Sequence, residues 1–416
     1  MRNFVKCFSV FIAGICVFIF AIIILGQLAI PKEVIVAENS KYEAPKIFGI
    51  SLFTCKEPVA SVGIVNTKAL NNEENVQVNF LNIIPVKRTN IKSVKRHYVV
   101  LGGEIFGIKL FTDGVLVVDT ESVKSGGNAV NPAEKSGIKI GDIIKSVNGK
   151  TVLTNKALSE IIEKSNGEEL NVTIVRGNDT LNVSFASVKE DATGKYKAGL
   201  WVRDSTAGIG TVTFYNPENN SFGGLGHAIC DIDTGEIMPM VNGEMAKAYV
   251  KGLYKSSNGC VGELCGVFTG ERQGSLCVNC EKGMYGFPAS IPKNKTVPVA
   301  LQNEVKKGEA EIVCTVDENG PKMYKIEIVK LLKKSGEINK DMIIKITDPE
   351  LLSKTGGILQ GMSGSPIIQN GMLVGAVTHV FINDPTQGYA IFADKMLETS
   401  ACEEMTAQKN NAQSVA

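Results

Sequence analysis

The sequence predicts a mainly β protein with one N-terminal membrane helix, a small domain of strands around one helix, and a larger β-barrel domain. Three observations lead to this prediction. An apolar stretch occupies residues 8–25, residues 99–190 alternate strand-like runs with one helical pattern, and residues 198–400 consist of short β-like runs joined by glycine turns. With 416 residues, of which 44% are hydrophobic, the chain is long enough for more than one core.

The charge balance excludes one broad class of partner. Lys and Arg together number 44, Asp and Glu number 43, and the net charge is +1. Such a chain has no general attraction to nucleic acid or to acidic lipid, so we predict no nucleic acid partner. Partners must therefore be argued from individual sites.

The N-terminal apolar stretch has the length of a membrane helix. Ser9 is its one clearly polar residue, and Arg2 and Lys6 precede it without an intervening acid. This pattern predicts an anchor over residues 1–31, with the remainder of the chain outside the cytoplasm. A cleaved signal peptide is the alternative, although no clean small-residue cleavage pattern follows.

Residues 32–98 show short β-like runs separated by polar, Asn-rich turns. We expect a β-rich linker region there, without a core of its own. At the other end of the chain, residues 401–416 are expected to form a flexible tail.

The helical pattern within residues 99–190 is amphipathic. Thr154 is suited to cap a helix on which Leu158, Ile161 and Ile162 form an apolar stripe. Just before it, residues 133–149 follow the pattern A-x-x-x-G-I-x-x-G-D-x-I-x-x-V-N-G. This block resembles the PDZ domain family.

The PDZ resemblance implies a groove between a strand and this helix, to which an extended peptide adds as a further strand. Its carboxylate-binding loop is expected at Phe106, Gly107 and Ile108. An alternative is a scaffold whose groove is filled by the chain itself.

A glycine-rich loop in the β-rich region offers a candidate nucleophile. It reads Gly361-Met362-Ser363-Gly364-Ser365-Pro366 and precedes a strand-like run. In an exported β-barrel, chymotrypsin-like proteases place their catalytic serine in such a loop, and Ser363 is the residue in register. Ser365 is expected to be a loop residue.

A serine hydroxyl needs a neighbouring base. The chain has three histidines, and His97 lies in a basic segment typical of a solvated surface. His227 lies among glycines upstream of Ser363 and is the leading candidate for the base. His379 follows Ser363 closely and is expected to line the cleft.

The orienting acid is expected to be Asp348, which gives the chain order His, Asp, Ser. Asp348 could instead only start a turn before Pro349. Asp231 and Asp233 follow His227 too closely and are expected in a turn. The backbone N–H groups of Gly361 and Ser363 are expected to form an oxyanion hole.

Four cysteines, Cys260, Cys265, Cys277 and Cys280, allow three interpretations. They could hold zinc, form disulfides in an exported domain, or remain free thiols. We expect no metal and no cofactor at the catalytic site.

The order of these motifs resembles the family of stage IV sporulation protein B, over residues 76–393. The segments that carry the resemblance are "GGLGHAI", "ITDPELL" and "GGILQGMSGSPIIQNGMLVGAVTHVFINDPTQGY". By motif, the family's catalytic residues fall on His227, Asp348 and Ser363.

The resemblance implies a signalling serine endopeptidase that works between the forespore and mother-cell membranes. It would cleave itself and a regulator of an intramembrane protease, and a late mother-cell sigma factor would then be activated. Two other hypotheses remain: a catalytically inactive PDZ-type peptide-binding module, and a zinc-dependent structural or redox factor built on the four cysteines.

Overall fold

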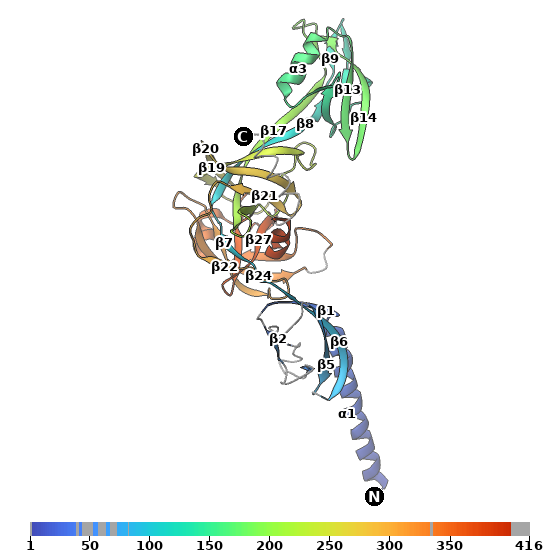
Figure 1. Cartoon of the computed structure of the whole chain (residues 1–416), viewed down its shortest axis with the longest axis vertical. Coiled ribbons are helices and arrows are strands. Elements are labelled where there is room, and N and C mark those ends of the chain that lie inside the picture. Colours follow the sequence, from blue (N-terminus) through green and yellow to red (C-terminus); the bar gives the residue numbers. More distant parts are fainter. Residues whose placement is uncertain are drawn as a thin grey trace. The chain divides into compact units, whose positions relative to one another are not determined.

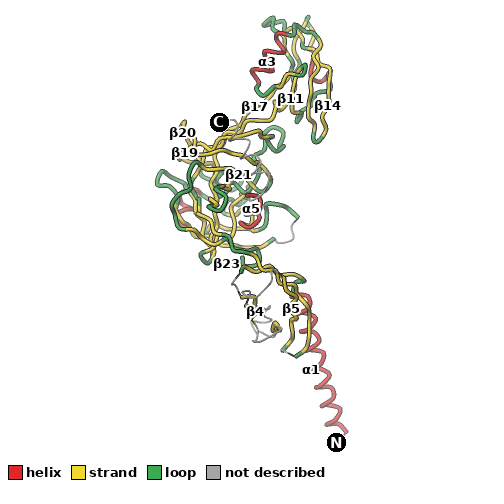
Figure 2. Tube along the Cα trace, in the orientation of Figure 1, coloured by secondary structure: helices red, strands yellow, loops and turns green. Residues whose placement is uncertain are grey.

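This computed structural model describes residues 2–38, 41–43, 53–56, 64–66, 73–81, 83–332 and 336–400. The fold is mainly β, as predicted, and strands make up most of the trace in Figure 2. The chain divides into two units, Met1–His97 and Tyr98–Ala416, each described by itself. The predicted tail, residues 401–416, lies outside the described residues.

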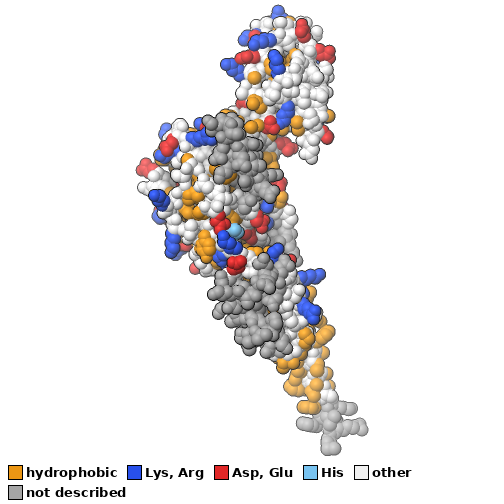
Figure 3. All heavy atoms as spheres, in the orientation of Figure 1, with side chains coloured by type: hydrophobic (Ala, Val, Ile, Leu, Met, Phe, Trp, Pro, Cys, Tyr) orange, Lys and Arg blue, Asp and Glu red, His pale blue; other side chains and the backbone are white. Residues whose placement is uncertain are grey.

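The first unit begins with helix α1 (Arg2–Ala29). Its stretch Phe8–Ala29 has a mean hydropathy of 3.1 and is long and apolar enough to cross a membrane. Figure 3 shows hydrophobic side chains gathered along this helix. A membrane anchor needs such a lipid-compatible surface.

A four-stranded sheet follows α1 in the order β1-β6-β5-β3, and β2 pairs with β4. The strands are β1 (Glu33–Ala37), β2 (Lys41–Glu43), β3 (Phe53–Lys56), β4 (Ile64–Asn66), β5 (Glu73–Phe80) and β6 (Ile84–Val94). Val36, Val78 and Ile91 are buried in a hydrophobic cluster of this unit. The region expected to be a linker without a core therefore contains one.

The second unit contains the PDZ domain and two barrels. Its first elements are β7 (Tyr98–Leu101), β8 (Ile105–Thr120), β9 (Val123–Ser125), β10 (Asn128–Val130), α2 (Pro132–Lys135), β11 (Ile143–Val147), β12 (Lys150–Thr151), α3 (Asn155–Lys164), β13 (Glu169–Arg176), β14 (Asp179–Ala186), β15 (Val188–Lys189) and β16 (Tyr196–Lys197).

Helix α3 forms as the sequence predicts. The Thr154 hydroxyl accepts a hydrogen bond from Ala157 N at 3.1 Å, and Leu158 and Ile162 are buried. They join a cluster formed with strands β8, β11 and β13, which is the core of the PDZ domain. Figure 1 shows α3 and the strands β13 and β14 in the same domain.

The first barrel is a ring of six described strands within a 12-stranded sheet. Its pairings run β8-β19-β20-β21-β18-β17, and β17 closes the ring by pairing with β8. These strands are β17 (Leu200–Asn216), β18 (Ser221–Gly224), β19 (Met240–Tyr254), β20 (Glu263–Cys280) and β21 (Gly283–Pro288), together with β8; β22 (Thr296–Pro298) pairs with β7 outside the ring.

The second barrel is closed by six strands in the order β23-β24-β25-β28-β27-β26. They are β23 (Gly308–Cys314), β24 (Lys322–Leu331), β25 (Met342–Ile346), β26 (Pro366–Gln369), β27 (Met372–Val380) and β28 (Gln387–Phe392), with helices α4 (Pro349–Thr355) and α5 (Ala393–Ser400) attached. Inward-facing residues such as Ile312, Ile344 and Val377 are fully buried.

Strands β8 and β17 belong to both the first barrel and the PDZ domain. In the barrel, Phe106 of β8 lies opposite Gly210 of β17; in the PDZ domain, Leu116 of β8 lies opposite Arg203 of β17. The PDZ domain is therefore an insertion between two paired strands of the barrel, as Figure 1 illustrates.

Candidate active site

Two loops, one from each barrel, meet at the candidate active site. The loop after β18 carries His227, and the loop before β26 carries Ser363. Gly364, with φ +94°, packs against the first loop so closely that a Cβ there would lie 2.4 Å from Leu225 N. Gly226, with φ +69°, would similarly place a Cβ 2.9 Å from Cγ2 of Thr378. Glycine is required at both positions: a Cβ at Gly364 would meet backbone atoms, a Cβ at Gly226 would meet side-chain methyl groups, and both residues have positive φ.

Ser363 is half-buried, and its hydroxyl donates a hydrogen bond to the backbone oxygen of Thr378 at 2.9 Å. The backbone oxygen of Ser363 accepts a hydrogen bond from Thr211 N at 3.0 Å. The side chain of Ser365, two residues later, is fully buried, and its hydroxyl donates to Met362 O at 2.6 Å. Ser363 is thus the loop serine whose hydroxyl is reachable, while Ser365 holds the loop together.

His227 is held by its own backbone. Its Nδ1 lies 2.7 Å from the backbone oxygen of Ala228. A carbonyl oxygen only accepts, so Nδ1 carries the proton and Nε2 has a free lone pair. Burial lowers the pKa of His227 below its usual value, which keeps the ring neutral and able to accept a proton.

His379 on β27 lies beside His227, with ring centroids 5.0 Å apart at 39°. Desolvation, followed by electrostatic repulsion from His227 and Lys340, lowers the pKa of His379 to about 4. The ring is consequently neutral at physiological pH. It lies beside the candidate site, one residue after the carbonyl that Ser363 contacts.

The backbone N–H groups of Gly361 and Ser363 have no hydrogen-bond acceptor within the described part of the chain. Their neighbours are satisfied: Met362 N donates to Leu359 O, and Gly364 N donates to Val377 O at 2.8 Å. Two unpaired donors next to a serine hydroxyl are suited to bind an oxygen that gains negative charge. Gly361 reaches this geometry with φ +94°.

Two threonines of β17 fix the serine loop, and no sequence motif marks them. The Thr211 hydroxyl donates to Gly361 O at 2.8 Å, and the Thr213 hydroxyl donates to Gly364 O at 2.7 Å. Both side chains are buried. Threonines that alternate on a strand fit any half-polar β-strand, so only the tertiary structure reveals their role.

Asn279 of β20 similarly fixes the histidine loop. Its side chain accepts from Ile229 N at 2.8 Å and donates to the backbone oxygens of Ile229 and Met238, at 2.9 and 3.1 Å. In the sequence the surrounding cysteines, Cys277 and Cys280, are conspicuous, and nothing marks Asn279 itself.

Arg203 of β17 also reaches the histidine loop. Its guanidinium forms ion pairs with Asp231 and, at 2.8 Å, with Asp233. The Asp231 side chain is fully buried and accepts hydrogen bonds from the backbone N–H groups of Asp233 and Thr234, both at 3.0 Å. The two aspartates therefore form a turn, as expected, and this turn is tied to β17.

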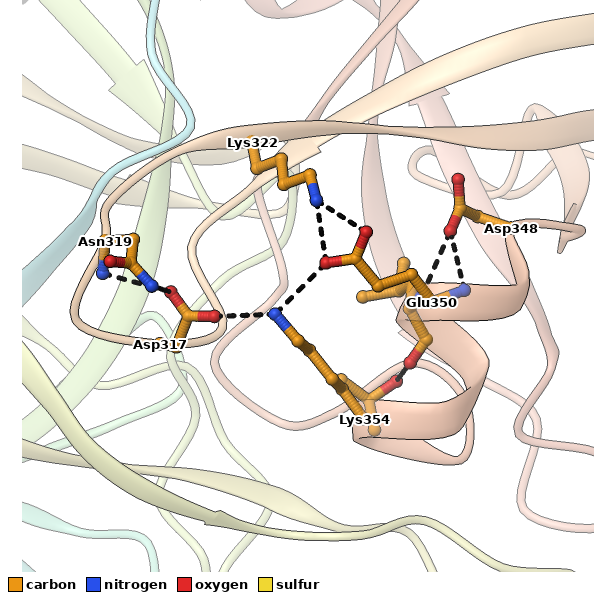
Figure 4. A network of polar contacts seen from close by, with 8 residues as sticks. Asp317, Asn319, Lys322, Asp348, Glu350 and Lys354 are labelled. Atoms are coloured by element: carbon orange, nitrogen blue, oxygen red, sulfur yellow. Dashed lines mark hydrogen bonds and ion pairs between the residues drawn. The ribbon is translucent and has the colours of Figure 1, made fainter.

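The structure does not bring Asp348 to His227. Its carboxylate caps α4, accepting from Glu350 N at 2.9 Å and Leu351 N at 3.2 Å, and it also accepts from Lys325 N at 3.2 Å. Figure 4 shows it at the start of α4, where its hydrogen bond from Glu350 N joins it to the ion pairs of Glu350 and Lys354. Because Asp-Pro begins a helix well, the N-terminus of α4 takes this carboxylate.

Although desolvation works to raise it, backbone hydrogen bonds from Leu351, Lys325 and Glu350 lower the pKa of Asp348. Its interactions are thus those of a helix cap. Helix α4 leads directly into the segment that carries Gly361 and Ser363.

The proposed peptide-groove residues lie elsewhere than expected. Phe106, Gly107 and Ile108 form part of β8 within the first barrel, paired with β17 on one edge and β19 on the other. Phe106 is fully buried and stacks edge-on against Phe222. A strand paired on both edges cannot accept a further strand, so this placement differs from the predicted one.

The four cysteines are free thiols and do not cluster. Cys265 and Cys277 lie on the same strand, β20, twelve residues apart, which corresponds to roughly 40 Å along an extended strand. Burial raises the pKa of both Cys277 and Cys280. The described structure thus gives neither a zinc site nor a disulfide among these four residues.

Comparisons with known proteins identify both domains. The SpoIVB peptidase S55 family model matches residues 194–397, and a PDZ domain model matches residues 90–186. A probable periplasmic serine endoprotease, DegP-like, of Brucella suis is 31% identical over 135 residues. That match covers 28% of this chain and 25% of the relative, so the chain spans about a quarter of the length of the curated relatives it matches.

Two solved structures are also similar. The active form of the Rv3671c protease from M. tuberculosis shares 16% identity, with a TM-score of 0.28, over 47% of this chain and 75% of that chain. The PDZ domain of an SdrC-like protein from Listeria monocytogenes shares 22% identity, with a TM-score of 0.19, over 22% of this chain and 90% of that chain. On the two family matches, the chain belongs to the SpoIVB peptidase S55 family and is a serine peptidase with a PDZ domain.

Proposed function

We propose that this protein is a membrane-anchored serine endopeptidase of sporulation signalling, with Ser363 as nucleophile and His227 as general base. It cleaves itself and a membrane-associated regulator of an intramembrane protease, and this leads to activation of a late mother-cell sigma factor. The observation that carries the peptidase site is the contact between the histidine and serine loops, where the backbone of Leu225 lies against Gly364.

The chemistry follows from the atoms available at this contact. Nε2 of His227 takes the proton of the Ser363 hydroxyl as Oγ attacks the peptide carbonyl, and the hydrogen bond to Thr378 O is given up. The carbonyl oxygen becomes an oxyanion and is bound by the N–H groups of Gly361 and Ser363. His227 then returns the proton to the leaving amine, and water hydrolyses the acyl-serine by the same steps.

Asp348 acts in this proposal as a positioning residue. Its capping of α4 fixes the start of the segment that runs to Ser363. The opposite end of α4 is held as well, because Ser256 N donates to Thr355 O at 2.8 Å and the Ser256 hydroxyl donates to Ile358 O at 2.9 Å. The backbone oxygen of Ala228 orients the base in place of a carboxylate.

The anchor and the location are supported by different observations. Helix α1 has the length and hydropathy of a membrane span. The DegP-like relatives are named periplasmic, which supports an extracytoplasmic position for the peptidase. Family membership supports the space between the forespore and mother-cell membranes, and protein substrates that include the chain itself.

The first test is self-cleavage of the full chain in detergent, followed by mass spectrometry. The variants are wild type, Ser363→Ala, His227→Ala and, as a matched serine control, Ser159→Ala on the exposed face of α3. We expect identical fragments from wild type and Ser159→Ala and none from the two site variants. Fragments in all four would overturn the assignment of Ser363 and His227.

The second test addresses the signalling role. In sporulating cells that carry the gene for Ser363→Ala, processing of the late mother-cell sigma factor should stop, while the Ser159→Ala strain should process it normally. Normal processing in the Ser363→Ala strain would remove the signalling proposal and would favour a peptide-binding role that needs no catalysis.

A further inference from the structure

One edge of the PDZ sheet is occupied by the chain itself. Strand β8 pairs with β11 on one edge and with the first residues of β17 on the other, where Leu200 lies opposite Thr120. Immediately before β17, Glu121 N donates to Gly199 O at 3.0 Å. PDZ domains take an extended peptide at such an edge, beside the helix. Residues 198–204 fill this position.

The same segment closes the helix side of the groove. Leu200 lines an apolar cavity together with Leu158 and Ile162 of α3. Four residues further on, the Asp204 carboxylate accepts a hydrogen bond at 2.8 Å from Asn155 N, the first residue of α3. One apolar side chain therefore enters the groove, and one acidic side chain caps the helix that forms its wall.

Gly199 fits the segment to this groove. It has φ +65°, and a Cβ at this position would lie 2.4 Å from Glu121 O and 3.0 Å from Cδ of Pro132. No other residue can take this conformation in the space available without displacing the backbone of β8 or its continuation.

The groove also lacks the loop that a free C-terminus needs. In a PDZ domain that binds a terminal carboxylate, backbone N–H groups of a loop hold the charge at one end of the groove. Here strand β8 enters from the first barrel without a break, and its residues before 113 are paired with β17 and β19. Their N–H groups are therefore engaged in the barrel.

We propose that residues 198–204 are the resident ligand of the PDZ groove, so that the groove is built for an internal extended segment with an apolar residue at the position of Leu200, and not for a free C-terminus. This inference concerns the PDZ domain and does not depend on the proposed catalytic residues. A partner peptide of the same internal type reaches the groove only by displacing this segment.

Displacement of the segment would reach the catalytic loops through β17. Arg203 of the same segment pairs with Asp231 in the histidine loop. Further along β17, Thr211 and Thr213 hold the serine loop. Release of residues 198–204 would therefore remove the Arg203 contact to the histidine loop directly, so occupancy of the groove by its own strand favours the ordered form of that loop.

The test measures binding of a probe peptide to the full chain in a Ser363→Ala background, where no cleavage interferes. The probe is a fluorescent peptide with the sequence of residues 196–205, YKAGLWVRDS, blocked at both ends. Leu200→Asp should expel the resident segment and bind the probe at least about tenfold more tightly than the parent, because a charge placed at this half-buried position against the apolar cavity destabilises the docked state. Leu181→Asp, at an exposed position of β14, is the matched control and should behave like the parent.

The single tryptophan supplies an independent signal. Trp201 lies next to Leu200 and is 56% exposed, so its intrinsic fluorescence reports on the segment. We expect a shift of its emission towards longer wavelength in Leu200→Asp and no shift in Leu181→Asp. The proposal would be overturned if the parent and Leu200→Asp bound the probe equally well. It would also be overturned if Leu200→Asp bound no probe and its tryptophan emission were unchanged.

Hydrogen exchange on the unmutated segment covers the case in which Leu200→Asp does not fold. Amides of residues 200–203 should exchange as slowly as those of β13, because both strands are paired within the PDZ sheet. Exchange as fast as that of an exposed loop would show that the groove is open and would refute the resident-ligand proposal.

Discussion

The hydroxyl of Ser363 donates to the backbone oxygen of Thr378 at 2.9 Å, one residue before His379, whose ring packs against His227. The nucleophile is thus held next to the histidine pair by a carbonyl, and not by the base itself. When a substrate binds, the Ser363 hydroxyl has to exchange its hydrogen bond to Thr378 O for one to Nε2 of His227. Catalytic hydrogen bonds are often long or poorly aligned in the free enzyme and tighten only when substrate is bound.

The first prediction concerns pH. Since burial lowers the pKa of His227, kcat/KM for a fluorogenic peptide taken from the self-cleavage site should stay level above pH 6.5 and fall only as the pH drops below this usual histidine value. His379, with a pKa of about 4, should add no inflection above that pH. An acid limb above pH 7 would contradict this and would indicate a carboxylate beside the ring.

The same pKa shift predicts a loss of stability in acid. The folded state binds a proton at His227 less tightly than the unfolded state does. The contribution of neutral His227 to the free energy of unfolding is therefore fully present above pH 6.5, the usual histidine pKa. It is lost as the pH falls through the lowered pKa of His227 in the folded state. Urea unfolding at each pH separates this effect from the loss of activity, and the difference between the chain and its His227→Gln variant isolates the histidine.

The second prediction concerns Thr211. Thr211→Val keeps the shape of a buried side chain but leaves Gly361 O without its donor, at a cost of about 1–3 kcal/mol. We expect kcat to fall by roughly tenfold with little change in KM, because the backbone N–H of Gly361, the proposed oxyanion donor, shifts with its carbonyl. Thr206→Val on the same strand is the control. Equal kinetics for both variants would show that Gly361 O needs no partner.

The third prediction separates two roles for Asp348. Asp348→Asn keeps a good helix cap and removes the charge, whereas Asp348→Ala removes the cap and should lower the free energy of unfolding by about 0.5–2 kcal/mol. We expect Asp348→Asn to retain most activity and Asp348→Ala to lose activity together with stability. If Asp348→Asn is as inactive as Ser363→Ala while its stability is unchanged, the carboxylate acts on His227 directly.

The fourth prediction concerns Arg203. Arg203→Met leaves Asp231 buried without its cation, and we expect the free energy of unfolding to fall by about 1–3 kcal/mol and the peptidase activity to fall with it. Asp233→Asn, on the half-exposed partner, should cost much less. Thermal unfolding and peptide hydrolysis of the two variants provide the comparison. Similar losses for both would mean that Asp231 is satisfied by its turn alone.

Local patterns predicted the elements well and their partners less well. Thr154, Leu158 and Ile162 lie on helix α3 as expected, because capping and apolar spacing are local properties. Residues 105–112 have the same alternation as the PDZ strands that follow them, yet they pair within the first barrel. Strand periodicity carries no information about which strand lies alongside.

The site shows the same division. Glycines around His227 and Ser363 marked two loops that the structure brings into contact. Asp348 followed the expected chain order, but its position before Pro349 is also a helix-cap signal, and the local interaction determines where its carboxylate lies. Thr211, Thr213 and Asn279 lie on strands, and their side chains form hydrogen bonds with the backbone of loops that are distant in sequence. No short sequence pattern encodes such long-range contacts.

The insertion of the PDZ domain between β8 and β17 has a consequence for how the chain folds. The first barrel cannot close until Ile105 meets Thr211, two residues separated by the whole inserted domain. Joining strands so distant in sequence is slow when the intervening chain is unfolded. Once the inserted domain has folded, Thr120 and Leu200 are already paired, and closure of the barrel becomes the zipping of a hairpin. The PDZ domain thus serves as the turn of that hairpin, so removing it would delay or prevent maturation of the peptidase before any question of activity arises.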